Sequence, residues 1–337
     1  MTNHLLLSIV LFGVMWLYLK IAARYNIVDQ PTDRTSHKTP TIRGGGIIFP
    51  VAVIFWFLLY GFQYPYIITG MVLISFISFL DDVKGVRASI RIIVHLLAVA
   101  LLFYEIGLLG FHWYWILFAL ILTIGCINAI NFMDGINGIT AFYSFITLGS
   151  FSLLNNAYNL LLPFFPMGLP AGWESFIPGG LVGTLMASLL VFGFFNARRK
   201  AVVFAGDVGS IGMAFLMSWL LINLMVKSKE FYWILFFAMY GIDTSYTIFI
   251  RILRKENIFK PHRLHLYQLL ANENGWPQLV VAALYAGIQL MLNLFVIYLV
   301  FTGKMNLIIF ITILAVLLAV YIFARYLATR KLAVSEA

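Results

Sequence analysis

The chain alternates long apolar runs with short polar connections. Eleven runs are long enough, at about 20 residues per membrane-spanning helix, to be interpreted as transmembrane helices, although the third is short. They cover residues 4–23, 44–62, 66–81, 89–109, 113–132, 137–155, 178–196, 209–226, 231–250, 277–301 and 306–326. The long connection 156–177 is rich in proline and is predicted to be an irregular or re-entrant surface segment.

Composition supports a lipid environment for this pattern. Of the 337 residues, 62% are apolar and only 10% are charged, so a soluble protein of this composition could not cover its surface. We therefore predict an all-α integral membrane protein with one polytopic domain over residues 1–337. The single cysteine, Cys126, excludes an intramolecular disulfide and a cysteine-based metal site.

The net charge of +9 could suggest a nucleic-acid partner, but its distribution along the chain indicates membrane topology instead. With the N-terminus outside, 19 of the 22 Lys and Arg residues lie in or beside cytoplasmic segments. We therefore predict an N-out, C-in orientation and expect no nucleic acid. The predicted cytoplasmic loops, which contain the main polar clusters, are 24–43, 81–91, 128–138, 197–209 and 251–277.

Two adjacent carboxylates, Asp81 and Asp82, follow the apolar run GMVLISFISFL. Their mutual repulsion and the cost of desolvation at a membrane boundary require a compensating cation or water. A divalent ion or a role in phosphoryl transfer would explain the pair. Two carboxylates at a helix C-terminus are also unfavourable because they oppose the helix dipole, which favours such a functional role. The alternative is a solvated helix end that pairs with Lys84, Arg87 or Arg91.

The stretch Asn128–Gly138 ends the fifth apolar run with more polar residues than a helix end needs. Asn128, Asn131 and Asp134 are spaced by three, so on a helix they fall within about 120° of one face. Such a face suits a sugar, a nucleotide or a hydrated metal ion, and Gly135 lets the backbone approach a ligand closely. An ordinary loop with a helix cap is the alternative.

A third cluster is the segment FNARRKAVVFAGDVGSIG at 195–212, in which the basic triplet 198–200 is interpreted as topological charge. The glycine-rich turn that follows presents free amides to an anion at a helix N-terminus. Asp207 could hold Mg²⁺ near phosphate oxygens. Alternatively, Asp207 or Ser210 simply caps the helix.

The segment KPHRLHLYQ brings together Lys260, His262, Arg263 and His265. These side chains could bind a diphosphate, since arginine pairs with phosphate oxygens through two parallel hydrogen bonds. The spacing of the histidines, with no nearby cysteine or carboxylate, does not indicate zinc. A solvated basic loop that touches anionic lipid heads is the alternative.

The first cytoplasmic loop ends in TSHKTPTIRGGG, with Lys38, Arg43 and three consecutive glycines at the start of a span. The glycines fit close helix packing and close approach of a phosphate equally well. Within the ninth span, the carboxylate of Asp243 is a functional candidate by default. We slightly favour a structural role, in which it pairs with a buried cation or amide of another helix.

Four motifs follow one another on the same predicted face. They are Asp81-Asp82, Asn128-x-x-Asn131-x-x-Asp134-Gly135, Phe195-Asn196 followed by Gly206-Asp207-x-Gly209-Ser210, and the Pro261 to His265 loop. In this order they resemble the polyprenyl-phosphate N-acetylhexosamine-1-phosphate transferases, the bacterial glycosyltransferase family 4. The resemblance covers nearly the whole chain, including the N-out layout with eleven spans.

This resemblance implies a reaction of UDP-N-acetylhexosamine with undecaprenyl phosphate that gives undecaprenyl-diphospho-sugar and UMP. It implies Mg²⁺ as the cofactor, with Mn²⁺ as an alternative, and a multi-pass enzyme surrounded by lipid in the bacterial inner (plasma) membrane. A homodimer is left open. The residues carried over are the catalytic pair Asp81 and Asp82, the metal ligands Asp207 and Asp134, and the substrate-binding residues Lys38, Asn128, Asn131, Asp134, Asn196, His262, Arg263 and His265.

Two positions depart from many members of that family. Asn137 stands where a second aspartate is common, and the loop HRLHLYQ lacks the Asp and paired histidines of the teichoic-acid and common-antigen enzymes. The patterns NFMDGxxG and HRxHxYQ are similar to the branch that initiates O-antigen, and so lipopolysaccharide, with modified sugars such as N-acetylfucosamine or N-acetylquinovosamine. The competing class is a membrane transporter or lipid-linked carrier, for which charges near the midplane and repeat symmetry are expected.

Overall fold

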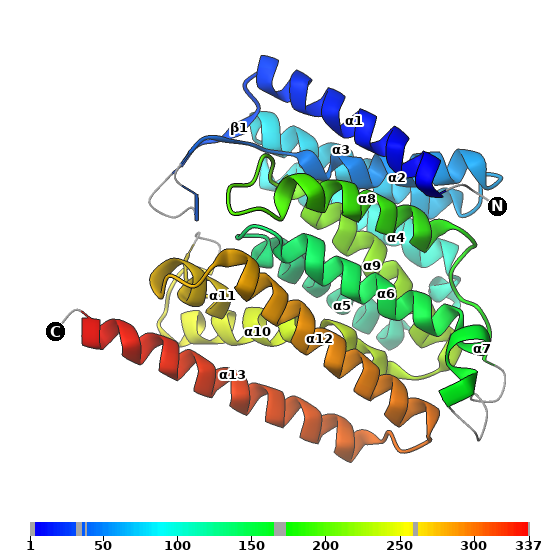
Figure 1. Cartoon of the computed structure of the whole chain (residues 1–337). Helices are drawn as coiled ribbons and strands as arrows, with labels where there is room; N and C mark the ends of the chain where they lie inside the picture. The colour runs from blue at the N-terminus through cyan, green and yellow to red at the C-terminus, as the bar shows by residue number, and fades with distance from the viewer. Residues whose placement is uncertain (1–3, 32–35, 38, 165–172, 259–261, 336–337) are drawn as a thin grey trace.

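The apolar runs form helices that lie side by side in the computed structural model, which describes residues 4–31, 36–37, 39–164, 173–258 and 262–335 (Figure 1). The helices are α1 His4–Arg24, η1 Gly45–Ile47, α2 Ile48–Leu59, α3 Pro65–Lys84, α4 Ala88–Glu105, η2 Leu108–Gly110, α5 Trp113–Met133, α6 Ile139–Asn155, α7 Ala157–Leu160, η3 Leu162–Phe164, α8 Leu181–Asn196, α9 Gly206–Ser228, η4 Phe231–Phe237, α10 Ala238–Leu253, α11 Leu266–Gln268, the π-helix η5 Leu269–Glu273, α12 Gln278–Phe301 and α13 Leu307–Ser335.

The prediction of an all-α polytopic membrane protein is confirmed, because each of the eleven predicted spans coincides with a helical segment of the described chain. Among the described residues, eight helices are long and apolar enough to cross a membrane, and three shorter apolar helices take the remaining places. The third span was expected to be short, but α3 has 20 residues and ends at Lys84. Asp81 and Asp82 therefore belong to its last turn.

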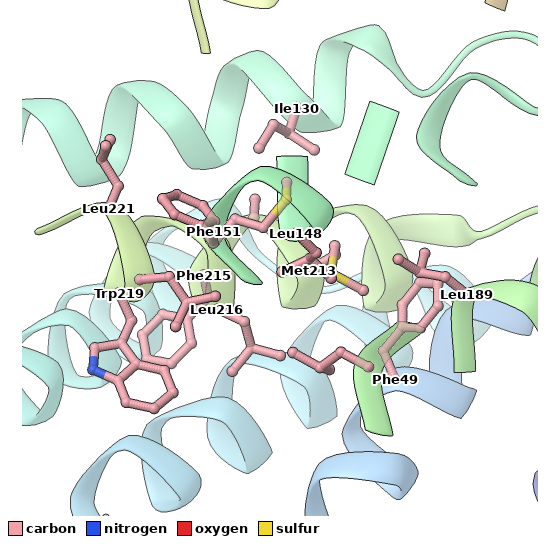
Figure 2. Close-up of a cluster of buried hydrophobic side chains, with 14 of the residues drawn as sticks. Phe49, Ile130, Leu148, Phe151, Leu189, Met213, Phe215, Leu216, Trp219 and Leu221 are labelled. Carbon is pink, nitrogen blue, oxygen red and sulfur yellow. The ribbon is translucent and has the colours of Figure 1, made fainter. Parts of the chain in front are cut away.

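Helix α9 is the centre of the bundle. In its most apolar window 94% of the residues are buried, compared with 6% for α13, so α13 is left to face lipid. Side chains of α9 such as Phe215 and Trp219 pack against residues from α2, α5, α6 and α8 (Figure 2). A helix that is apolar on all sides is stable only when other helices surround it, and the remainder of the fold meets that requirement.

The two chain ends lie at opposite ends of the bundle, as an odd number of crossings requires (Figure 1). The end near the C-terminus, termed the inner end here, contains the turns 85–87, 134–138 and 197–205 and is the predicted cytoplasmic side. At the other end, the described part of 156–177 has only the short helices α7 and η3, in agreement with the predicted irregular segment.

Two short strands tie the loops of the inner end together. Strands β1 Val28–Asp29 and β2 Thr41–Ile42 are antiparallel, and Ile42 forms an isolated bridge with Val203. The N–H groups of Gly45 and Gly46 then donate to the carbonyl oxygens of Phe204 and Ala205, at 2.8 and 2.9 Å. The loop before α2 is thereby fixed to the loop before α9.

The glycines of the GGG motif serve close packing. A Cβ atom on Gly46 would lie 2.0 Å from the Cα of Gly209, and one on Gly209 would lie 2.7 Å from the Cα of Gly46. Because the amides of Gly45 and Gly46 already donate to backbone carbonyls, they are not available to a phosphate. The sequence leaves open whether these glycines serve helix packing or the approach of a phosphate. For Gly45 and Gly46, the structure shows close packing.

We predict that Gly46→Ala lowers the free energy of unfolding by about 1–3 kcal/mol, the usual cost of overpacking. The added Cβ would collide with the Cα of Gly209, which belongs to the backbone and cannot rotate away. Thermal unfolding in detergent measures the effect. Gly149→Ala is the matched control, since a Cβ there meets nothing within 4 Å. Equal unfolding midpoints for the two variants would contradict the packing role.

Candidate functional site

A polar cavity of about 290 Å³ opens at the inner end of the bundle. Its walls come from the C-terminal end of α5, the turn 134–138, the first residues of α9 and the first inner loop. The predicted site residues Asn131, Asp134, Asn196 and Asp207 line it together. Segments far apart in the chain thus converge on one concave surface, which is the usual arrangement of an active site.

Asp207 is the central carboxylate of this cavity. Its Oδ1 accepts a hydrogen bond of 3.2 Å from Nδ2 of Asn131, and the same amide donates to Oγ of Ser210 at 2.9 Å. Two arginines approach it as well, Arg43 at 3.4 Å from Oδ1 and Arg91 at 3.8 Å from Oδ2. The side chain remains 22% exposed, so it can still reach a ligand in the cavity.

The adjacent carboxylates Asp81 and Asp82 have different surroundings. Asp81 pairs with Arg91 and accepts a 2.7 Å hydrogen bond from the N–H of Val86, and its side chain is 15% exposed. The side chain of Asp82 has no exposed surface and lies 2.7 Å from Nε of Arg43. Pairing of the helix end with Arg91, one of the two interpretations of this dipeptide, is therefore observed for Asp81.

Asp134 follows the last residue of α5 and accepts a short hydrogen bond from the hydroxyl of Thr140. Burial raises the pKa of Asp134 to about 6; the Thr140 hydrogen bond opposes this rise, and the nearby charge of Asp207 adds to it. Both carboxylates line the polar cavity and repel each other there. A cation between them would relieve this repulsion.

The turn 134–138 packs against Tyr267 and is bonded to Asn196. A Cβ on Gly135 would lie 2.1 Å from the hydroxyl oxygen of Tyr267, so only glycine fits there. Asn196, which is 4% exposed, accepts from the N–H of Gly138 at 2.8 Å and donates to the carbonyl of Val203 at 2.9 Å. Asn196 therefore ties two loops together as well as lining the cavity.

Asn137 has a structural contact of the same kind. Its Nδ2 donates to the carbonyl oxygens of Arg198 and Arg199 at 2.8 and 3.4 Å, and its N–H donates to Oε1 of Gln278 at 2.9 Å. Gln278 in turn donates to the carbonyl of Ser36. An aspartate at this position could not donate these side-chain hydrogen bonds.

Asn128 does not share the cavity with Asn131 and Asp134. Its Nδ2 donates to the carbonyl of Ile124 in its own helix, and it lines a second, largely apolar cavity of about 990 Å³. This apolar groove lies between α5, η4, α10 and α13, and His262 lines it together with Asn128. The 120° spread of the Asn–Asn–Asp stripe is wide enough to divide it between two cavities.

The loop 262–268 is anchored from inside the bundle. Nδ1 of His265 lies 2.9 Å from Oδ1 of Asp243, and the hydroxyl of Tyr285 donates to Oδ2 at 2.6 Å. Asp243 thus pairs with a buried group of another segment, as we slightly favoured. His265 is 2% exposed and lines neither cavity, and Arg263 lies 3.8 Å from Glu273.

Several residues of the polar cavity had no assigned role in the sequence interpretation. Asp29, His37, Arg43, Phe204 and Gln268 all line it. Arg43 stands directly before the glycine motif, a position that could have drawn attention to it. The predicted substrate residue Lys38 lies outside the described residues, so its role stays a prediction.

No group of three or more His, Cys, Asp and Glu side chains is arranged around a common metal position in the described parts of the chain. Mg²⁺, however, is commonly held by one or two carboxylates together with substrate phosphates and water. Asp207 and Asp134 provide two repelling carboxylates beside the amide of Asn131 in one polar cavity. The donor set therefore fits Mg²⁺ bound jointly with a phosphorylated substrate.

Comparison with known proteins agrees with this geometry. The model of glycosyl transferase family 4 matches residues 64–225, which include α3, α5 and most of α9. The match spans 162 of the 337 residues and supports the family predicted from the motifs. The chain is a multi-pass membrane protein with the polar motifs of a phospho-glycosyltransferase at one end of the bundle.

Its relatives extend the similarity beyond the matched region. A probable undecaprenyl-phosphate N-acetylglucosaminyl 1-phosphate transferase of Bacillus subtilis is 28% identical over 272 residues, 74% of this chain and 71% of the relative. The undecaprenyl-phosphate alpha-N-acetylglucosaminyl 1-phosphate transferase of Salmonella typhi is 27% identical over 290 residues, with coverage of 79% and 75%. The corresponding protein of Escherichia coli K12 is 26% identical, with the same coverage.

His262 gives a prediction of pH dependence. Burial, together with the neighbouring His265 and Arg251, lowers the pKa of His262 from 6.5 to about 4. A lowered folded-state pKa means that the unfolded chain binds more protons between these values, so stability is lost as the pH falls from about 6.5 to about 4. His262→Gln, which cannot titrate, should lose less thermal stability over that interval.

Unfolding midpoints measured in detergent from pH 4 to pH 7 test this prediction. His112→Gln, a change at an exposed histidine before α5, controls for the loss of an imidazole and should behave like the wild type. The same acid-induced loss in wild type and His262→Gln would show that His262 is not responsible.

Proposed function

We propose that this chain transfers an N-acetylated amino-sugar 1-phosphate from a UDP-sugar to undecaprenyl phosphate, giving undecaprenyl-diphospho-sugar and UMP. The proposal rests chiefly on one observation, the position of the polar cavity and the apolar groove on two sides of the same helix end. The last turns of α5 present Asn131 to the cavity and Asn128 to the groove. A water-soluble nucleotide sugar and a lipid phosphate could therefore meet there.

The apolar groove suits a polyprenyl chain. Aromatic and aliphatic side chains line it from Phe132 and Phe249 towards Phe310, while Asn128 and His262 are among its few polar groups. Helix α13, which is the least buried of the long helices described, forms one wall of the groove. Burial of each CH₂ group of a lipid stabilises binding by about 0.8 kcal/mol, so a long prenyl chain has ample binding energy in such a groove.

The polar cavity suits the diphosphate of the donor. Arg43 and Arg91 lie on either side of Asp207 and provide positive potential for phosphate oxygens. Asp207 and Asp134 would hold Mg²⁺, or Mn²⁺ in its place, which when bound neutralises the diphosphate and stabilises the departing UMP. The side chains of Asn131 and Asn196 line the cavity without adding negative charge, and both are held in place by hydrogen bonds within the protein.

The reaction that these groups favour is a single displacement. An oxygen of the lipid phosphate forms a bond to the β-phosphorus of the UDP-sugar, while the bond between that phosphorus and the oxygen bridging to UMP breaks. A covalent enzyme intermediate is unnecessary, because holding both reactants in line already supplies much of the acceleration. Enzyme that becomes phosphorylated with UDP-sugar alone would contradict a single displacement.

The donor sugar is proposed from the motif pattern. The sequences HRLHLYQ and NFMDGING favour a modified N-acetylated sugar, of the FucNAc or QuiNAc type, over GlcNAc. The step would be the first membrane reaction of O-antigen or another cell-surface polysaccharide, in the bacterial inner membrane. The relatives, by their names, act with N-acetylglucosaminyl 1-phosphate, so GlcNAc belongs in the same donor panel.

A direct assay tests this function. Purified protein, undecaprenyl phosphate, Mg²⁺ and a panel of UDP-HexNAc donors should release UMP, with one donor clearly preferred. A transporter or lipid carrier would release no UMP under any of these conditions. Omission of undecaprenyl phosphate is the internal control, because UMP released without it would indicate hydrolysis and not transfer.

We predict that Asp207→Asn abolishes Mg²⁺-dependent UMP release while the fold is retained. Loss of several kcal/mol of charge stabilisation would slow the reaction by roughly a hundredfold or more. Thermal unfolding should be little changed, because the N–H of Asp207 still donates to Asp82. Glu230→Gln, just before η4 at the opposite end, is the control. Near-normal turnover in Asp207→Asn would remove the metal assignment.

The groove gives a separate prediction. Gly125 and Gly241 line it, and a Cβ on either meets no atom within 4 Å, so a leucine side chain there would take up space in the groove. Gly125→Leu and Gly241→Leu should raise KM for undecaprenyl phosphate roughly tenfold, about the loss expected when two CH₂ groups of the lipid are displaced. KM for the UDP-sugar should not change.

Gly149→Leu in α6 is the matched control, because its Cβ also meets nothing within 4 Å and it does not line the groove. A short-chain prenyl phosphate should be less affected than the long-chain acceptor. An unchanged KM for undecaprenyl phosphate in both groove variants would place the lipid elsewhere.

A further inference from the structure

The two carboxylates of the Asp81-Asp82 pair are not equivalent, and Asp82 is fully engaged in the protein. Its Oδ1 accepts from the N–H of Asp207 at 3.0 Å, and its Oδ2 accepts from the N–H of Val208 at 3.1 Å. Its side chain has no exposed surface and does not line the polar cavity. Asp82 therefore presents no oxygen to a substrate there.

These contacts make Asp82 the N-terminal cap of a different helix. The residue before α9, Ala205, has no side-chain oxygen, and the helix has no cap of its own. The first N–H groups of a helix need acceptors, and a carboxylate there also interacts favourably with the helix dipole. Asp82 supplies both from the last turn of α3.

The local sequence permits this approach at short range. Gly206 has φ +71°, and a Cβ on it would lie 2.5 Å from Oδ2 of Asp82. A side chain at Gly206 would thus displace the carboxylate from the helix end. Arg43, with its Nε 2.7 Å from Oδ1, compensates the charge of Asp82, which a buried carboxylate requires.

We propose that Asp82 is a positioning residue, which holds the first turn of α9 and with it the carboxylate of Asp207. Within the adjacent pair, only Asp81 keeps exposed carboxylate surface. This inference deepens the proposed function, on which it rests, by dividing the roles of two residues that the motif alone presents as one catalytic pair. It predicts different consequences for replacing each of them.

The test uses Asp82→Asn and Asp82→Ser in the full-length protein. Asparagine and serine are both good helix caps, so each should preserve part of the positioning, although neither can deprotonate or attack a substrate. We expect KM for Mg²⁺ to rise about threefold, less than the roughly five- to tenfold that complete removal of a helix cap typically produces, with kcat at saturating Mg²⁺ reduced less still. Asp81→Asn should lower kcat instead.

Two readouts do not depend on turnover. Mn²⁺ binding, followed by electron paramagnetic resonance with UDP present, should weaken in both Asp82 variants. Hydrogen exchange of the peptide 205–212 should become faster, because the amides of Asp207 and Val208 lose an acceptor. Unchanged Mn²⁺ affinity and exchange, together with a collapse of kcat, would overturn the proposal and assign Asp82 to the chemistry.

Glu105→Gln is the matched control. Oε2 of Glu105 accepts from the N–H groups of Tyr66 and Ile67, at 2.7 and 3.2 Å, and so caps α3 from α4 at the opposite end of the bundle. The chemistry of this contact is the same, but it lies far from the cavity. Its replacement should leave Mn²⁺ binding and the exchange of 205–212 unchanged.

Carboxyl footprinting of the wild-type protein covers the case in which the Asp82 variants do not fold. A water-soluble carbodiimide with an amine should label Asp207, which is 22% exposed, and leave Asp82 unmodified. Labelling of Asp82 in the folded protein would contradict the proposal. If no donor yields UMP, the proposed function fails, while footprinting and hydrogen exchange still decide the role of Asp82.

Discussion

The hydrogen bonds from the first turn of α9 to the carboxylate of Asp82 are the interaction on which the site depends. Helix α9 forms the centre of the core and also carries Asp207 in its first turn, so any shift of this turn moves Asp207 directly. The contact in turn depends on Gly206, which leaves space, and on Arg43, which balances the charge. A buried carboxylate is stable only when both conditions are met.

A second constraint is that the inner end of α5 borders both a polar cavity and an apolar groove. Three residues along an α-helix correspond to a rotation of about 60° between side chains, so Asn128 and Asn131 can face different cavities while remaining one turn apart. The apolar groove reaches the lipid side of α5, and the polar cavity reaches the inner loops. A soluble fold has no need for such a division, whereas an enzyme that joins a lipid to a nucleotide sugar requires it.

The positions of the helices could be predicted from sequence, because burial in lipid demands long apolar runs and basic residues mark the ends. The convergence of Asn131, Asp134 and Asp207 could also be expected, since motifs on one face must share a small area. The direction in which a single side chain points could not be predicted from the sequence. His265 lines neither cavity because it pairs with Asp243 of α10, and no local pattern reveals that partner. Arg43 resembles a topological charge until its carboxylate partner is seen, whereas pairing of Arg91 with the Asp81-Asp82 dipeptide is one of the interpretations of the sequence.

Asn137 shows why a departure from a family motif need not be a change in chemistry alone. In this chain its amide donates to two backbone carbonyls of the loop 197–205, and its backbone is held through Gln278 to the first inner loop. A carboxylate there would face carbonyl oxygens and be repelled. The loss of a negative charge from the cavity is thus coupled to the packing of the three loops around it. Asn137 therefore acts through the shape of the cavity as much as through the absence of a charge.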